Sequence, residues 1–264
     1  MLNLPQNPKW DIARVSHSTL VNADCFDVFP FIEDKSIDAI ICDLPYGTTA
    51  CKWDSILPLD KLWDEYKRIL KPNGIVILFG SQPFTSSLIV SNLKWFKYEI
   101  IWDKVSKTNS MNSKYQPLKQ HENIVVFYNK FRTYNQIKTT GKKWSRGGVK
   151  KVDRTSKYYQ QRNELFVIGD KLQHDKDDQK LPTSILTVSN ADKTKRTHPT
   201  EKPIDLMEWL IKTYTNEGDM VLDNTMGSGT CGLAAIKNNR RFIGIEKEKQ
   251  YYDVAVRRAS EYCH

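Results

Sequence analysis

Long apolar runs are missing from this chain of 264 residues. No stretch approaches the roughly 20 consecutive apolar residues that a membrane-spanning helix needs, and the mean hydropathy is -0.56. The first residues also lack the charged-then-apolar order that is typical of a signal peptide. These absences exclude a membrane protein and predict a cytoplasmic one.

Cysteine pairs are missing as well. The five cysteines are odd in number and include no Cys-x-x-Cys pair. We therefore expect free thiols in a reducing compartment, with neither a disulfide framework nor a metal site. Cys42 and Cys231 lie beside the motifs described below, and we expect both to be small buried apolar residues.

Charge is abundant and unevenly placed. The chain carries a net charge of +9, and the segment 131–196 alone holds 16 Lys and Arg against 7 Asp and Glu. The rest of the chain is therefore neutral overall. Because Trp144, Tyr158, Tyr159 and Phe166 are interleaved with the basic residues, the segment is typical of a nucleic-acid contact. A solvated lysine-rich loop is the alternative.

The order of apolar segments predicts an α/β fold. Strands and helices alternate up to about residue 130 and again from about 197, which indicates one Rossmann-like, mostly parallel sheet with helices on both faces. We expect residues 1–130 and 197–264 to form two halves of one domain, with 131–196 inserted between them. The expected strands are 19–21, 36–43, 75–79, 97–102, 123–128, 165–168, 220–223 and 241–246. The expected helices are 59–70, 84–92, 203–214, 232–238 and 250–262.

The strand expected at 36–43 ends in Asp43-Leu44-Pro45-Tyr46. Ligands of open α/β sheets bind outside the carboxyl ends of strands. There a carboxylate and the Leu44 carbonyl can accept hydrogen bonds from an amino group, while Tyr46 stacks on a flat ring. The tetrapeptide therefore suits a nucleobase, although taken alone it is also typical of a simple turn.

A glycine-rich loop follows the strand expected at 220–223. Gly227, Gly229 and Gly232 have the Gly-x-Gly-x-x-Gly spacing between a strand and a helix, and Glu246 ends the next strand. Asp223 would repel a pyrophosphate but attract an ammonium or sulfonium group. The pattern therefore favours S-adenosylmethionine over a dinucleotide, with Glu246 on the ribose. The cofactor-binding candidates in this region are Asp223, Gly227, Ser228, Gly229, Thr230 and Glu246.

Two further segments offer cofactor candidates. Asp24 follows the short strand expected at 19–21, where it either meets the cofactor or caps the next turn. Thr200 and Lys202 precede the helix expected at 203–214. Thr200 either serves as the N-cap of that helix or, with Lys202, reaches the methionine carboxylate.

With both motifs placed, the chain resembles the β-class DNA amino-methyltransferases. In that family a catalytic Asp-Pro-Pro-Tyr motif comes first, a target-recognition insert follows and the cofactor loop comes last. Here Asp43-Leu44-Pro45-Tyr46 corresponds to the catalytic motif, and the loop Asp223–Thr230 resembles Asp-Pro-Phe-Met-Gly-Ser-Gly-Thr. His198–Pro203 and the stretch from Trp102 to Asn123 are similar to further family segments. Two departures are Leu44 for proline and Asn224-Thr225 for Pro-Phe.

The resemblance implies the methyltransferase fold and a mechanism. The target nucleotide is flipped out of double-stranded DNA, Tyr46 stacks on the base, and Asp43 and the Leu44 carbonyl accept hydrogen bonds from its amino group. Direct displacement then moves the methyl group from S-adenosylmethionine. In this family Asp in the first motif position goes mostly with adenine N6, so adenine is the expected target. Pro45 is part of the same catalytic set.

The resemblance also implies partners and a source. Expected DNA contacts in the basic insert are Lys142, Lys143, Arg146, Lys150, Lys151 and Arg154. A bacterial or phage source fits the family, and its members include dimers and enzymes paired with a restriction endonuclease. Four alternatives stay open: cytosine-N4 methylation, RNA or protein-glutamine methylation, a non-catalytic DNA-binding module and, most remotely, a nicotinamide oxidoreductase.

Overall fold

A computed structural model describes residues 9–47, 55–130, 133–140, 179–190 and 201–263. Thr200 and the expected strand at 165–168 lie outside these residues. So do all six basic candidates, Lys142, Lys143, Arg146, Lys150, Lys151 and Arg154. The chain divides into two units, one of residues 1–135 and 183–264 and a smaller one of Gln136–Pro182. In the smaller unit, β7 (Thr139–Thr140) pairs antiparallel with β8 (Gln179–Lys180).

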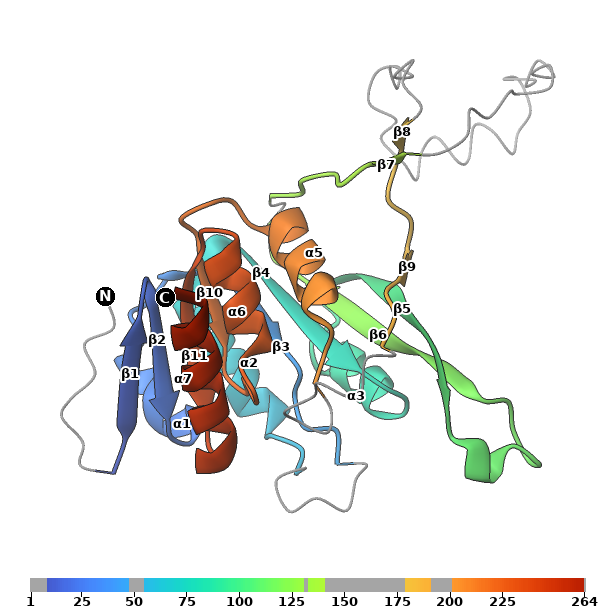
Figure 1. Ribbon diagram of the computed structural model, residues 1–264, viewed down its shortest axis with the longest axis horizontal. Coiled ribbons are helices and arrows are strands. Elements are labelled where there is room, and N and C mark those ends of the chain that lie inside the picture. The colour runs from blue at the N-terminus through green and yellow to red at the C-terminus, as the bar shows by residue number, and fades with distance from the viewer. Residues whose placement is uncertain (1–8, 48–54, 131–132, 141–178, 191–200, 264) are drawn as a thin grey trace. The chain divides into compact units, whose positions relative to one another are not determined.

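The larger unit is built on a nine-stranded sheet in the order β1-β2-β11-β10-β3-β4-β6-β5-β9 (Figure 1). Its strands are β1 (Asp11–Val15), β2 (Ser18–Asn22), β3 (Ile37–Cys42), β4 (Leu70–Gly80), β5 (Phe96–Thr108), β6 (Lys119–Phe127), β9 (Ile185–Thr187), β10 (Met220–Asp223) and β11 (Arg241–Glu246). The five strands from β2 to β4 in this order are parallel. Strands from both ends of the chain are therefore neighbours, which confirms the expected single sheet built from both ends of the chain.

Strand β3 has apolar side chains on both faces of the sheet, so both faces need to be covered. All six of its side chains are buried. Ala39 and Ile41 join one core cluster, whereas Ile40 and Cys42 join the other, as the two-residue period of a strand requires. An apolar run of this kind is typical of a parallel strand buried on both faces.

Helices cover both faces of the sheet (Figure 1). The larger ones are α2 (Leu59–Ile69), α3 (Phe84–Ser91), α5 (Ile204–Tyr214), α6 (Thr230–Lys237) and α7 (Lys249–Cys263), and the short ones are α1 (Cys25–Val28), η1 (Phe29–Phe31) and η2 (Ser110–Asn112). Buried side chains of α5, α6 and α7 fill one core cluster, while those of α1, α2 and α3 fill the other. No helix among the described residues is long and apolar enough to span a bilayer.

The structure adds features that the sequence pattern did not predict. Strand β1 pairs antiparallel with β2, and β6 runs antiparallel between β4 and β5. Strand β9, inside the segment expected as an insert, pairs parallel with β5. Helix α5 begins at Ile204 with Pro203 as its N-cap residue, so of the two roles considered for Thr200 the N-cap role is wrong.

Candidate functional site

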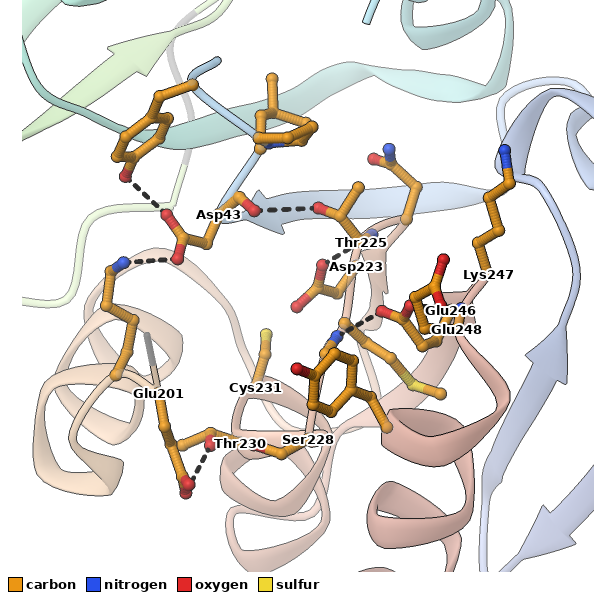
Figure 2. A pocket seen from close by; sticks show the side chains of 18 of the residues that line it. Asp43, Glu201, Asp223, Thr225, Ser228, Thr230, Cys231, Glu246, Lys247 and Glu248 are labelled. Carbon is orange, nitrogen blue, oxygen red and sulfur yellow. Dashed lines mark hydrogen bonds and ion pairs between the residues drawn. The ribbon is translucent and has the colours of Figure 1, made fainter. Parts of the chain in front are cut away.

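A cavity of about 480 Å³ lies where β3, β10 and β11 end, a volume within the usual range of small-molecule sites. Asp43 follows β3, Asp223 ends β10 and Glu246 ends β11. All three carboxylates line this cavity, and Figure 2 shows them around a common space. The tertiary structure thus joins two motifs that lie about 180 residues apart in the chain.

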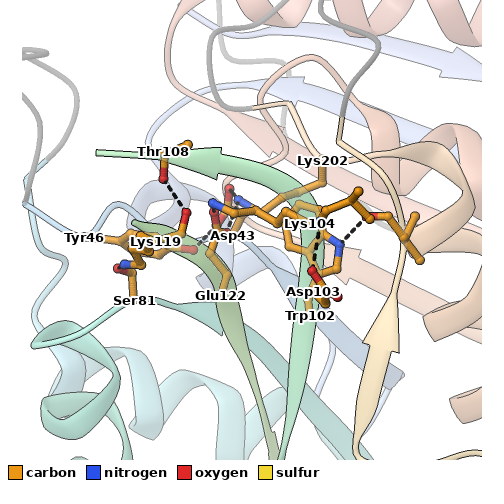
Figure 3. Close-up of polar contacts among 12 residues, drawn as sticks. Asp43, Tyr46, Ser81, Trp102, Asp103, Lys104, Thr108, Lys119, Glu122 and Lys202 are labelled. Carbon is orange, nitrogen blue, oxygen red and sulfur yellow. Dashed lines mark hydrogen bonds and ion pairs between the residues drawn. The ribbon is translucent and has the colours of Figure 1, made fainter. Parts of the chain in front are cut away.

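The Asp43 carboxylate is held on both oxygens. The Tyr46 hydroxyl donates to Oδ1 at 2.5 Å, and the Lys202 ammonium donates to Oδ2 (Figure 3). The Asp43 side chain nevertheless keeps 23% of its surface exposed. A hydrogen-bond donor that enters the cavity can therefore reach this carboxylate.

Aromatic and apolar packing keeps the Asp43-Leu44-Pro45-Tyr46 turn in place. The Tyr46 ring stacks on the buried Phe84 ring, with 5.2 Å between centroids and 25° between planes. Leu44 is 3% exposed and belongs to the core cluster that also contains Phe84. A leucine at this position thus anchors the turn through side-chain burial, and this accounts physically for the departure from proline.

Four charged groups form a chain beside the turn. The Lys104 ammonium lies 2.9 Å from the Glu122 carboxylate, whose other oxygen is 3.5 Å from Lys202. Burial alone would raise the pKa of Glu122, but the ammonium groups of Lys202 and Lys104 lower it. Burial would likewise lower the pKa of Lys202, but Asp43 and Glu122 raise it. The pKa shifts of Glu122 and Lys202 therefore both favour the charged form of the group.

The role expected for Lys202, a contact with a methionine carboxylate, stays a prediction. In this structure its ammonium belongs to the Asp43 side of the cavity, where it also lies 5.1 Å from the centre of the Phe79 ring. An ammonium over an aromatic face gains electrostatic stabilisation, which partly offsets its burial.

The glycine-rich loop brings its backbone close to the cavity. Gly227 has φ +53° and Gly229 has φ +78°, a region that L side chains rarely adopt. A Cβ on Gly229 would also lie 2.7 Å from the Cβ of Ala255 in α7. Gly227 lines the cavity. Gly229 contributes indirectly, because the absence of a side chain there allows the loop to pack on α7.

Glu246 is oriented by the backbone. Its Oε2 accepts from the Gly227 N–H at 2.9 Å, and its Oε1 accepts from the Glu248 N–H at 2.7 Å. Burial raises the pKa of Glu246, although these two hydrogen bonds oppose the shift. Each oxygen retains a further lone pair, so the carboxylate can still accept from a pair of hydroxyl groups.

Asp223 is a buried acid with little local compensation. It is 3% exposed, and the one hydrogen bond that its carboxylate receives from the backbone comes from Thr225 N–H at 3.1 Å. Burial raises the pKa of Asp223 to about 8, and the negative charge of Asp43 adds to the rise. A cation in the cavity would relieve this cost, because an opposite charge favours the ionised carboxylate.

Asn224 and Thr225 connect the two motifs. The Thr225 hydroxyl donates to the Asp43 carbonyl at 3.2 Å (Figure 2). The Asn224 side chain turns into the core, where it accepts from the Tyr66 hydroxyl at 2.6 Å. These residues, which depart from Pro-Phe, thus align the loop after β10 with the turn after β3.

The remaining loop residues are braced by charged neighbours. Arg258 donates to the Ser228 carbonyl at 2.8 Å and forms an ion pair of 2.8 Å with Glu201. The Thr230 hydroxyl donates to the same Glu201 at 3.2 Å. Ser228, Thr230 and Glu201 all line the cavity.

Of the two roles expected for Asp24, the cap is confirmed, and contact with the cofactor stays a prediction. Its Oδ1 accepts from Phe26 N–H at 3.0 Å and so caps α1, and it also lines the cavity. Its other oxygen forms an ion pair of 3.1 Å with Lys247, the residue after Glu246.

Several cavity residues were missed by motif reasoning. They are Phe84 behind Tyr46, and Glu122, Trp102, Glu201, Asn190 and Tyr251 in or beside the cavity. Trp102, Glu122 and Glu201 carried a signal, because they lie in segments that were part of the family resemblance. The expected burial of Cys42 and Cys231 is confirmed. Among the described residues, no cluster of His, Cys, Asp and Glu has the make-up of a metal site.

Comparisons with known proteins agree with this geometry. Residues 37–257 match the family model described as DNA methylase. The Type II methyltransferase M1.MboII of Moraxella bovis is 28% identical over 250 residues, which cover 88% of this chain and 92% of that protein. The Type II methyltransferase M2.DpnII of Streptococcus pneumoniae is 29% identical, with 90% and 88% covered.

Two solved structures that are similar to this chain are also of methyltransferases or of their complexes with SAM. The crystal structure of the M1.HpyAVI–SAM complex aligns with a TM-score of 0.63 and 26% identity, covering 91% of this chain and 98% of that one. The cytosine-N4-specific PvuII DNA methyltransferase aligns with a TM-score of 0.64 and 16% identity, covering 92% and 86%. The second likeness is one of fold.

Proposed function

The chain belongs to the DNA methylase family of amino-methyltransferases, and from that premise we propose that it methylates the N6 amino group of adenine in double-stranded DNA. The observation that carries the proposal is the shared cavity. The Asp43 carboxylate, which can accept hydrogen bonds, lines the same cavity as the buried Asp223 and as Glu246, whose carboxylate is suited to accept from ribose hydroxyls. One side suits an amino group, and the other suits a cationic nucleoside.

S-adenosylmethionine fits the acidic side of the cavity. Asp223 would hold its ammonium group, because the buried carboxylate is otherwise poorly compensated. Glu246 would accept from the ribose hydroxyls while Gly227 N–H keeps the carboxylate oriented. Asp24, Ser228 and Thr230 line the same cavity. When bound, this cofactor supplies an electrophilic methyl group on a sulfonium centre.

The chain's own residues would position the target base. Tyr46, backed by Phe84, offers a flat surface for a flipped base. Asp43 and the Leu44 carbonyl would accept from its exocyclic amino group and aim the nitrogen lone pair at the methyl group. Lys202 keeps the Asp43 carboxylate in place from the side. Transfer in such a site depends mainly on positioning.

Adenine is preferred over cytosine because Asp43 occupies the first motif position, which in this family goes mostly with adenine. The test is to incubate the protein with unmethylated duplex DNA and labelled S-adenosylmethionine, digest the DNA and identify the labelled nucleoside. N6-methyladenine is expected. Label on N4-methylcytosine would reassign the target base, and cofactor binding without any label on DNA would favour a non-catalytic DNA-binding module.

The partners follow from this activity. We propose that Lys142, Lys143, Arg146, Lys150, Lys151 and Arg154 contact DNA phosphates, since the segment 131–196 carries the whole net charge. A cognate restriction endonuclease, a homodimer and a cytoplasmic location in a bacterium or phage-infected cell complete the proposal. Co-purification and light scattering would test the two assemblies.

A further inference from the structure

The hairpin formed by β5 and β6 extends beyond its neighbours in the sheet. Pairing of β4 with β6 ends at Gly80 and Asn123, and pairing of β9 with β5 ends at Asp103. Residues 105–120, here called the arm, lie past these points and project from the sheet edge (Figure 1). The arm therefore has no strand neighbour outside its own hairpin among the described residues.

The arm carries charge of one sign. From Lys104 to His121 the chain has four lysines and no Asp or Glu. Lys104 is paired with Glu122, but Lys107 and Lys114 are exposed. This is a second basic region, separate from the basic segment 131–196.

The tip of the arm presents large apolar side chains to solvent. Met111 is 94% exposed and Tyr115 is 87% exposed. The tip is nevertheless ordered: Asn112 Nδ2 donates to Asn109 Oδ1 at 2.8 Å, and Tyr115 N–H donates to the Asn112 carbonyl at 2.9 Å. A structured turn that exposes an aromatic ring between lysines does not stabilise its own core, so its surface suits a partner.

The base of the arm belongs to the catalytic cavity. Thr108 lines the cavity together with Asp43, and Lys119 donates to Ser81 near Tyr46 (Figure 3). Tyr115 follows Thr108 by seven residues, which span at most about 25 Å when extended. The 3-10 turn Ser110–Asn112 makes the actual span shorter than this limit. When a flipped base is held in the cavity, the duplex that it came from therefore lies within reach of Tyr115.

We propose that the arm binds the DNA duplex beside the flipped base, with Lys107 and Lys114 on phosphates and Tyr115 stacked on an exposed base. The inference rests on the proposed function and adds a second DNA contact to it. The chemistry is complementary, because lysines neutralise phosphates without regard to sequence and aromatic rings stack on unpaired or exposed bases.

The test uses the full-length protein and unmethylated plasmid DNA. For the double variant Lys107→Gln/Lys114→Gln, we expect the slope of log affinity against log salt to fall by about two. For Tyr115→Ala, we expect about a tenfold or greater loss of DNA affinity, with the salt slope unchanged and Tyr115→Phe close to wild type. The affinity for S-adenosylmethionine should stay unchanged in every variant.

Matched controls lie outside the arm. Lys61→Gln/Lys67→Gln removes two exposed charges of α2, and Leu93→Ala removes an exposed apolar side chain. Wild-type DNA affinity and salt slope in the arm variants would overturn the inference and leave the arm to a protein partner. If the wild type binds DNA through the arm but never methylates it, the proposed function falls while the arm inference stands.

Discussion

At the scale of single residues, Asp43 and Asp223 divide the work of the cavity through their surroundings. Asp43 is partly exposed and paired with Lys202, so its charge is neutralised locally. Asp223 is buried without an adjacent cation among the described residues, and its pKa rises to about 8. The first carboxylate suits a neutral amino group, and the second suits a cation.

The variant Asp43→Asn should separate chemistry from cofactor binding. The amide keeps the shape of the side chain but loses the charged acceptor, so we expect methyl transfer to fall by at least about 100-fold. The affinity for S-adenosylmethionine should stay within a few-fold, because the main residues proposed to hold it, Asp223 and Glu246, lie at the ends of two other strands, β10 and β11. Single-turnover transfer and calorimetry measure the two effects. Transfer at the wild-type rate would mean that Asp43 is not the acceptor.

Asp223 should make cofactor binding release a proton. At pH 7 a carboxyl with a pKa of about 8 is mostly protonated, and a bound ammonium group requires it to ionise. We therefore expect release of about one proton at pH 7, and an affinity that rises as the pH approaches 8. Titration calorimetry in buffers of different ionisation enthalpy measures this release. In Asp223→Asn both the release and most of the affinity should be lost; equal heats in all buffers for the wild type would contradict the assignment.

At the scale of elements, the loop after β10 depends on its contact with α7. The loop turns at Gly227 and Gly229, and Arg258 of α7 donates to the Ser228 carbonyl. The Glu246 carboxylate at the end of β11 accepts a hydrogen bond from the Gly227 N–H. The loop is therefore fixed by one helix and one strand before a ligand arrives, and this pre-organisation reduces the ordering cost of binding.

Two glycine variants should measure that contact. Gly218 and Gly229 both have φ near +80°, so alanine at either position costs about 1–2 kcal/mol for the left-handed backbone. Only at Gly229 would the new Cβ also meet Ala255, whereas nothing lies within 4 Å at Gly218. We expect Gly229→Ala to lose about 1–3 kcal/mol more than Gly218→Ala in urea unfolding and to weaken cofactor binding. Equal losses in the two variants would remove the packing argument.

At the scale of the whole molecule, the excess positive charge and the carboxylates of the cavity lie in different segments of the chain. The cavity belongs entirely to the larger unit, whereas the excess charge is in the segment 131–196. The proposed phosphate contacts, in this segment and in the arm, are thus made by other residues than the proposed chemistry, as expected when phosphate contacts position DNA and other groups read or modify bases.

The salt dependence of DNA binding should report this separation. Replacing Lys142 and Lys143 by alanine is expected to reduce the slope of log affinity against log salt by about two, because each phosphate contact releases counterions. The kcat for transfer at saturating DNA should change little. Lys61→Gln/Lys67→Gln on α2 is the control for net charge. An unchanged slope would remove Lys142 and Lys143 from the DNA contact.

The sequence by itself determined the features that depend on neighbours in the chain. The buried strand before Asp43, the cap at Asp24 and the glycine turn before α6 follow from local periodicity, hydrogen bonding and backbone freedom. The order of the two motifs was likewise readable. These features needed no knowledge of which strands are adjacent.

Only the tertiary structure decided which side chains share a charge. Lys202 and Asp43 are 159 residues apart. Lys202 also forms an ion pair with Glu122, because β6 runs antiparallel beside β4, two strands from β3 in the sheet. The burial of Leu44 and the stacking of Phe84 on Tyr46 arise in the same way. Such contacts depend on strand order and on packing between distant segments. A local sequence pattern does not specify which distant residue becomes the partner.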